Sequence, residues 1–89
     1  MADSVILLDK LIRDKEVQEQ RPRGDITYKE VEVNSGLSYV TIQKLSKDPR
    51  SWSRITLNRL TEYFERPLSE VLVDFEDLPI EIQEIFDRV

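Results

Sequence analysis

The side chains that could carry chemistry in this chain are amides, hydroxyls, amines, guanidinium groups and carboxylates, because the sequence contains no histidine and no cysteine. Their absence removes the imidazole base, the thiolate nucleophile, disulfides and nearly every structural zinc site. Two glycines are too few for a glycine-rich phosphate loop, and the carboxylates of the tail lie on a polar helix face without metal-ligand spacing. The sequence therefore predicts a protein that is not an enzyme and needs no cofactor or metal.

One group of residues has a spacing that suits recognition. If residues 39–47 form a helix, positions i, i+1, i+4, i+5 and i+8 share one face, and they hold Tyr39, Val40, Gln43, Lys44 and Lys47. A glutamine side chain can pair with the edge of adenine and a lysine with that of guanine. The two residues at the start of the helix could contact a thymine methyl group or a sugar. The alternative is a solvated helix face whose first two residues shield the adjoining turn.

Charge is unevenly distributed along the chain. The net charge is −5, yet residues 21–66 hold nine basic and six acidic side chains, whereas residues 67–89 hold one basic and seven acidic. Within residues 38–59 a single acidic residue, Asp48, stands against five basic ones: Lys44, Lys47, Arg50, Arg54 and Arg59. Charges more than about 8–10 Å apart are largely screened at physiological salt, so a local basic surface can act despite an acidic total.

The apolar pattern predicts short helices and no strand. Helices are expected over residues 4–16, 28–35, 39–47, 54–64, 68–73 and from 79 to the end, with an exposed loop over residues 20–25. The expected caps are Asp3 or Ser4, Thr27 (with Glu30 completing a capping box), Ser38 and Ser53. Glu65 departs from the pattern, because glycine or asparagine suits the end of the 54–64 helix better.

The stretch NSGLSYVTIQKL, residues 34–45, is typical of a tight elbow between two helices. Gly36 tolerates the positive φ that such a turn requires, Leu37 provides an apolar plug, and Ser38 caps the second helix. We expect Val31, Ile42 and Leu45 to join Leu37 in holding the two helices together. The second helix would then project its opposite face away from the body.

Residues 26–72 resemble the phage-repressor type of helix-turn-helix domain, the Xre-like family. The matching features are the GLS turn, the TI..L pattern in the helix that follows, TLNRL in the fourth helix and LSEVL in the fifth. The resemblance implies an all-α fold, a compact five-helix domain that binds operator DNA as a homodimer, here with an additional acidic C-terminal helix. It divides the chain into residues 1–75, the DNA-binding domain, and residues 76–89, an acidic amphipathic helix for docking or dimerisation.

The resemblance and the local chemistry together give a set of candidate contacts to double-stranded DNA. Base contacts are assigned to Tyr39, Val40, Gln43 and Lys44. Phosphate contacts are assigned to Thr27, Tyr28, Lys29, Ser38, Thr41, Lys47, Arg50, Ser53 and Arg54, several of which are also helix caps whose neighbouring N–H groups attract phosphate. Trp52 is expected to pack over the loop between two of these arginines, with its indole N–H free to reach a phosphate.

Two positions depart from the family's pattern. Glu32 stands where the family usually has a small residue at the contact between the two helices, and an unpaired carboxylate cannot be buried there without a cost of several kcal/mol. We expect either that the helices splay or that Glu32 turns outward to a cation such as Lys44. Tyr28 stands where the family usually has a glutamine, and its phenol could serve the same phosphate contact.

The tail carries an apolar stripe that must be covered. Leu78, Ile82, Ile85, Phe86 and Val89 fall on one side of an otherwise acidic helix. Three covers remain open: the first helix, a second copy, or another protein.

The main hypothesis is a sequence-specific transcriptional regulator that reads the major groove with residues 39–47. The alternative is a protein-binding adaptor or antitoxin that keeps the fold without strong DNA binding, and a third hypothesis combines a DNA-binding elbow with a partner-recruiting tail. The sequence has no apolar run of the roughly 20 residues that span a membrane, and its amino end lacks the basic start of a signal peptide. We therefore expect a cytoplasmic protein.

Overall fold

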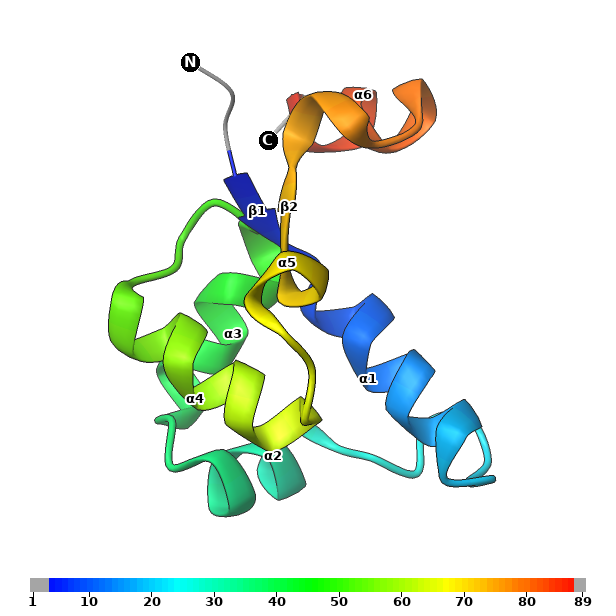
Figure 1. The fold of residues 1–89 in the computed structure, drawn as a ribbon, viewed down its shortest axis with the longest axis vertical. Helices are drawn as coiled ribbons and strands as arrows, with labels where there is room; N and C mark the ends of the chain where they lie inside the picture. Colours follow the sequence, from blue (N-terminus) through cyan, green and yellow to red (C-terminus); the bar gives the residue numbers. More distant parts are fainter. Residues whose placement is uncertain (1–3, 88–89) are drawn as a thin grey trace.

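The computed structural model describes the backbone of residues 4–87 and the side chains of residues 4–85. Over this range the fold is mostly helical, with six α-helices, one 3-10 helix and one sheet of two short strands (Figure 1). In chain order the elements are β1 Ser4–Ile6, α1 Leu8–Gln18, α2 Tyr28–Ser35, α3 Tyr39–Lys47, α4 Arg54–Phe64, α5 Leu68–Val71, β2 Leu72–Asp74, the 3-10 helix η1 Phe75–Asp77 and α6 Ile80–Asp87.

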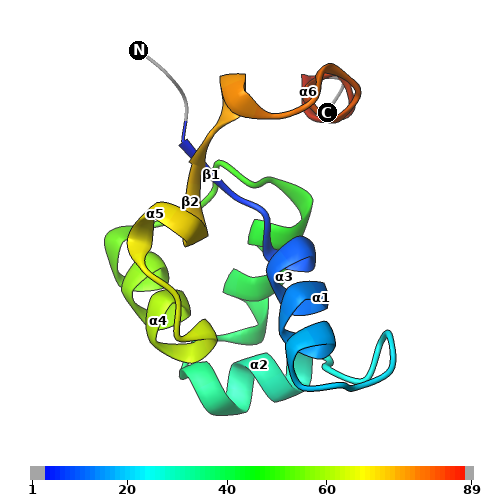
Figure 2. The same ribbon diagram turned by 45° about the vertical axis from the view of Figure 1, so that its right-hand side comes forward.

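Helices α1 to α5 form the body of the molecule, and α6 stands at one end of it. In Figures 1 and 2, α2 lies at the end opposite α6, and the strand pair leads from the body to the α6 end. Among the described residues of the expected tail stripe, Leu78 and Ile82 are half-buried, whereas Ile85 is 60% exposed. Val89 lies outside the described residues, and so does the side chain of Phe86. The face of α6 that carries Ile85 is thus uncovered.

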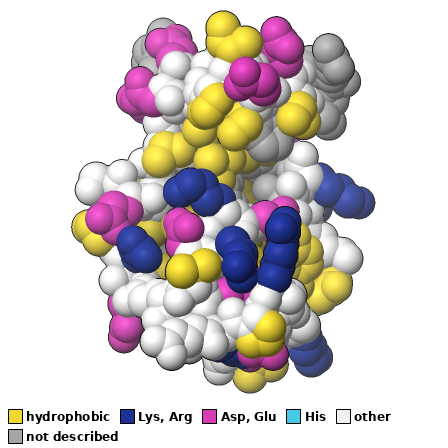
Figure 3. Space-filling view, turned by 90° about the vertical axis from the view of Figure 1, so that its right-hand side faces the viewer, with side chains coloured by type: hydrophobic (Ala, Val, Ile, Leu, Met, Phe, Trp, Pro, Cys, Tyr) yellow, Lys and Arg dark blue, Asp and Glu magenta, His cyan; other side chains and the backbone are white. Residues whose placement is uncertain are grey.

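The α6 end also differs from the body in charge. On the side of the molecule shown in Figure 3, yellow and magenta side chains gather on the α6 end, and dark blue ones lie on the body below it. The acidic residues of this end are Asp74, Glu76, Asp77, Glu81 and Glu84. The charge segregation read from the sequence is therefore also a segregation in space.

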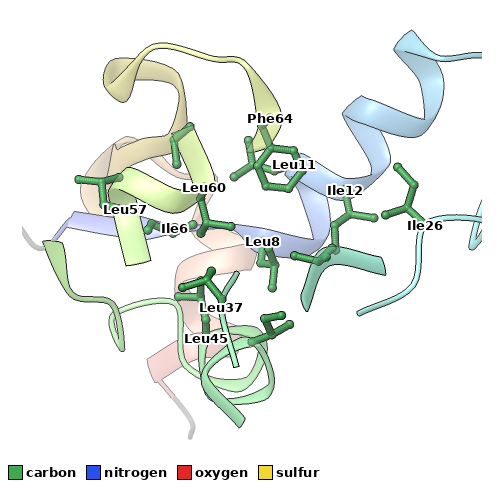
Figure 4. Packing of buried hydrophobic residues seen from close by; sticks show 13 residues of the cluster. Ile6, Leu8, Leu11, Ile12, Ile26, Leu37, Leu45, Leu57, Leu60 and Phe64 are labelled. Carbon is green, nitrogen blue, oxygen red and sulfur yellow. The ribbon is translucent and has the colours of Figure 1, made fainter. Parts of the chain in front are cut away.

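The core lies between α1, α3 and α4, where apolar side chains at helical spacing face one another (Figure 4). Leu8, Leu45 and Leu60 are at most 2% exposed and form its centre. Each of these helices has polar residues on its outer side, so burying the apolar stripe is what fixes its orientation. The remaining buried members of the cluster are Ile6, Leu11, Ile12, Ile26, Val31, Leu37, Ile42, Leu57, Phe64 and Val71.

The bounds of α2, α3 and α4 confirm the expected caps. The hydroxyl oxygens of Thr27, Ser38 and Ser53 each accept a hydrogen bond of 3.2 Å from the backbone N–H three residues later. These bonds satisfy donors that a helix start otherwise leaves without a partner. The expected second half of the capping box is not formed, because the Glu30 carboxylate instead binds the Arg21 guanidinium at 2.8 and 2.9 Å.

The amino end corrects the expectation of a chain without strands. Residues 4–6 form β1, which pairs antiparallel with β2 in the register Val5 to Val73, and the first helix begins only at Leu8. Val5 and Ile6 are fully buried, and β-branched residues favour an extended chain with packing on both faces. The Ile6 N–H also donates to the Pro49 carbonyl at 2.9 Å. Asp3, one of the two expected caps, lies outside the described residues.

A buried carboxylate holds the loop between α1 and α2. Glu16 is 2% exposed, and its Oε2 accepts hydrogen bonds from the backbone N–H groups of Gly24 (2.9 Å) and Ile26 (3.0 Å). Arg13 approaches the other carboxylate oxygen at 3.4 Å. The Ile26 N–H is the main reason that the pKa of Glu16 is lowered; burial opposes it, and the contacts from Arg13 and Gly24 support it. The loop therefore delivers the chain to Thr27, the cap of α2, in a fixed position.

We predict that Gly36→Ala destabilises the fold by about 1–2 kcal/mol, because Gly36 has φ +80°, a left-handed conformation that L-residues adopt at that cost. Urea denaturation followed by circular dichroism measures the change. Gly24→Ala is the control that has backbone strain alone, since Gly24 has a similar left-handed conformation (φ +86°) but open space where an added Cβ would lie. An unchanged unfolding midpoint for Gly36→Ala would show that this turn does not depend on its glycine.

We predict that Glu16→Gln lowers stability near neutral pH and that its deficit shrinks in acid. The lowered pKa means that ionised Glu16 stabilises the fold above the ordinary value of 4.5, and that this stabilisation is lost as the pH falls through the folded-state pKa. Urea midpoints of both proteins at about pH 7 and about pH 3 test this. Glu62→Gln, at an exposed position of α4, is the control. An equal deficit at both pH values would contradict the role assigned to the carboxylate.

Candidate functional site

The elbow between α2 and α3 is built as the sequence predicted. Gly36 takes φ +80°, and its N–H donates to the Glu32 carbonyl at 3.1 Å, which closes α2. The next N–H, from Leu37, donates to the Ser35 hydroxyl at 3.2 Å, and that hydroxyl donates in turn to the Val31 carbonyl. Leu37 is 7% exposed and seals the inside of the turn. These bonds leave little freedom in the direction in which α3 departs.

The elbow brings the expected recognition residues together on the outside of α3. We define the α3 face as the exposed side chains Tyr39, Val40, Gln43, Lys44 and Lys47. Val40 is 59% exposed, which is a large fraction for an apolar residue at the start of a helix. Ile42 and Leu45, on the opposite side, are at most 2% exposed. The α3 face thus presents an amide and two amines beside two apolar contacts.

The Glu32 carboxylate accepts a hydrogen bond from the start of α3 and pairs with a cation other than the expected Lys44. Its side chain is half-buried, and its Oε2 accepts a hydrogen bond of 3.1 Å from the Tyr39 backbone N–H, the first of α3. Its partner cation is Lys29, at 3.3 Å from Oε1, and not Lys44. The carboxylate therefore satisfies one of the open N–H groups of α3 and adds a negative charge where the helix dipole favours one.

Tyr28 has an internal role. Its hydroxyl donates to Asp9 Oδ1 at 2.5 Å and lies 2.5 Å from the Ser46 hydroxyl, so it ties α2 to α1 and α3. Burial raises the pKa of Tyr28, and the neighbouring Asp9 carboxylate adds to that increase. The phenol is thus engaged with Asp9 and Ser46 within the fold, and the phosphate contact expected for it stays a prediction. Its ring also meets that of Tyr39 edge to face, with 6.5 Å between centroids.

The predicted phosphate contacts separate into exposed cations and side chains that are already engaged within the fold. Lys47 and Arg54 are exposed, and Lys29 is 76% exposed although it pairs with Glu32. Arg50 is half-buried, with its guanidinium stacked 4.2 Å from the centre of the Phe75 ring. A cation so placed packs the loop after α3 onto η1. The hydroxyls of Thr27, Ser38 and Ser53 already accept the cap bonds of their helices, and the Thr41 hydroxyl lies 2.8 Å from that of Ser38.

A shallow open groove of about 320 Å³ lies between α3 and the start of α4. Three predicted contacts, Thr41, Lys44 and Ser53, line it together with Ser51, Trp52 and Thr56. The polar part of the lining consists of four hydroxyls and the Lys44 amine, groups that can bind an anion such as phosphate, and Trp52 adds an apolar wall. Thr56 was missed by sequence reasoning, although its position three residues after the Ser53 cap places it in the first turn of α4. Its hydroxyl lies 3.0 Å from that of Ser53.

Two side chains near the α3 face act on structure in ways that the sequence did not reveal. The Trp52 indole N–H donates to the Ser4 carbonyl at 2.9 Å, so it holds β1 and is not free for a phosphate. Arg59 lies over the elbow, with Nη1 3.1 Å from the place that a Cβ on Gly36 would take. Both contacts join residues far apart along the chain, and no local pattern announces them.

The described residues contain no group of three or more acidic, histidine or cysteine side chains placed to hold a metal ion. Within the same range, no helix is long and apolar enough to cross a membrane. Comparison with known proteins adds no family: no protein-family model, no curated protein and no solved structure matches the chain. The geometry of the α3 face and of the neighbouring groove is therefore what any functional assignment must rest on.

Proposed function

We propose that the protein is a sequence-specific DNA-binding regulator that inserts α3 into the major groove. The observation that carries the proposal is the α3 face, an exposed helix surface with an amide and two amines that follows the turn at Gly36. An α-helix fits the width of the major groove, where each base pair shows a distinct set of donors and acceptors. The Xre-like resemblance of residues 26–72 supports the same function. Binding of this kind requires no catalysis, no metal and no cofactor.

The residues have separate tasks in this proposal. Gln43 and Lys44, in the middle of the α3 face, read base edges, and Tyr39 and Val40 contact methyl groups or sugars beside them. Lys47 and Arg54 bind phosphates on the two sides of the helix, which sets the position of the protein without reading sequence. The groove beside Lys44 receives a further phosphate. Tyr28 and Arg50 act indirectly, because they fix the elements that carry the contacts.

The resemblance to the Xre-like family implies a two-copy arrangement. Two α3 helices that enter successive major grooves on one side of the duplex lie about 34 Å apart. The bound site would then be roughly palindromic, with half-sites one helical turn apart. A homodimer on double-stranded DNA is thus part of the proposal.

The second candidate function is a protein-binding module, an adaptor or antitoxin. The acidic carboxylate of Glu32 at the start of α3 and the acidic α6 with its exposed Ile80 and Ile85 favour it. Both features repel phosphate and suit a basic protein surface. A combined function would bind DNA through α3 and a protein partner through α6.

We predict salt-sensitive binding to duplex DNA, measured by fluorescence anisotropy with a random pool and then with sequences selected from it. Gln43→Ala or Lys44→Ala should cost about 1–3 kcal/mol at one base pair and relax the preference there. Arg54→Ala should weaken binding to all sequences alike, because phosphates carry no sequence information. No binding at low salt and micromolar protein would reject the proposal. Equal effects of all three substitutions on every sequence would reject the reading role of α3.

We predict that Glu32→Gln binds DNA more tightly than the wild type, by up to about 1 kcal/mol, the scale of one charge at a helix end. The amide keeps the hydrogen bond from the Tyr39 N–H and removes the negative charge beside the incoming phosphates. Anisotropy titrations at low and high salt measure the gain, which should fade as salt rises. Glu62→Gln, on the exposed side of α4, is the control for a change in total charge. Weaker binding by Glu32→Gln would mean that the carboxylate assists the contact.

A further inference from the structure

The outer face of α6 is an exposed surface of mixed apolar and acidic character. It consists of Ile80, Glu81, Glu84 and Ile85, at positions i, i+1, i+4 and i+5, which share one side of a helix. Ile80 is 67% exposed and Ile85 60%. The inner side is fixed by Gln83, whose Nε2 donates to the Leu78 carbonyl at 2.7 Å. Ile80 and Ile85 border the two glutamates on this exposed side of the helix.

The α3 face has the complementary composition at the same spacing. Its first four members, Tyr39, Val40, Gln43 and Lys44, also stand at i, i+1, i+4 and i+5, and Lys47 follows one turn later. The two helices are nearly equal in length, with eight residues in α6 and nine in α3. Lys44 and Lys47 stand three residues apart, as do Glu81 and Glu84, so the two helices packed side by side can place each glutamate beside a lysine.

The charges around the two faces also oppose each other. Residues 67–89 carry seven acidic side chains and one basic, whereas residues 38–59 carry five basic and one acidic. On the side shown in Figure 3, the described residues of the α6 end display magenta side chains beside yellow ones. Such a pairing of potentials favours association and steers it.

Within one molecule the two faces do not meet. The exposure of Val40 and Ile85 shows that neither is covered. The strand that leads to α6 is held by its pairing with β1, and β1 is fixed to the loop after α3 by the bond from Ile6 to Pro49. This anchoring keeps α6 at its own end of the molecule (Figures 1 and 2). Among the described residues, neither face is therefore available to cover the other within one molecule.

We propose that the outer face of α6 docks on the α3 face of a second copy of this chain. The acidic helix would then occupy the surface that the proposed function assigns to DNA, and would mimic its charge. Because this contact joins two different surfaces, it closes into a pair only if both copies exchange their helices, and otherwise extends into chains. DNA and self-association would compete for α3, so the protein would be released for DNA by dilution or by a high-affinity site.

The test uses the full chain without DNA, so it does not depend on the proposed function. Sedimentation should show association that increases with concentration and decreases with salt, and ¹⁵N-labelled protein should show concentration-dependent shifts at residues 39–47 and 80–85. Glu81→Lys/Glu84→Lys should weaken this association at least about tenfold, since two exposed ion pairs become repulsive. The matched control is Glu62→Lys/Glu65→Lys, which makes the same change of charge at exposed positions at the end of α4 and should associate like the wild type.

A charge exchange provides the decisive arm. Lys44→Glu/Lys47→Glu alone should lose self-association, and so should Glu81→Lys/Glu84→Lys alone. A mixture of the two variants should associate, because the basic α6 of the second variant fits the acidic α3 face of the first. A monomeric wild type at all concentrations would overturn the inference. So would an equal loss in the control, or shifts confined to the small apolar cavity bordered by Leu7, Leu11, Val73 and Leu78. None of these outcomes would decide whether α3 binds DNA, which the anisotropy titrations test separately.

Discussion

The left-handed turn at Gly36 is the constraint on which the rest of the structure depends. A helix that continued through this residue would leave Leu37 on the surface and would separate Ile42 and Leu45 from the core. With the turn in place, Leu37 seals the elbow, and the apolar side of α3 packs against α1 and α4. Burial of that one side is what leaves the other side exposed. The exposure of the α3 face is thus a consequence of how the core packs.

The charges of the molecule are divided between its two ends. The acidic excess of the sequence is concentrated in residues 67–89, and three carboxylates of the body are engaged in contacts within the fold. Glu16 holds a loop through two backbone N–H groups, Glu30 binds Arg21, and Glu32 caps α3. The buried Glu16 and the paired Glu30 contribute little to the field outside, whereas Glu32 lies beside the α3 face. The α3 face can therefore remain cationic on a protein whose net charge is −5.

Local signals predicted the middle of the chain well. Thr27, Ser38 and Ser53 act through hydrogen bonds to residues three positions away, and Gly36 acts through its own φ, so a short stretch of sequence contains the cause of each boundary. The strand β1 could not be predicted in this way, because Val5 and Ile6 fit a helix or a strand equally well and their partner lies about 70 residues further along the chain. The internal roles of Trp52, Tyr28 and Arg50 were missed for the same reason. Each depends on a contact with a distant residue: packing of Trp52 over the loop was expected, but its bond to Ser4 was not, and Tyr28 and Arg50 were assigned to phosphate.

Whether α3 binds DNA is tested by a ¹⁵N–¹H titration of the dilute protein with a short duplex selected from a random pool. Dilution suppresses the contact proposed between α6 of one copy and α3 of another. We expect the largest shifts on residues 39–47 and on residues 51–56 around the groove, and we expect salt to reduce them. Shifts confined to residues 76–87, or an unchanged spectrum at a large excess of DNA, would contradict this expectation.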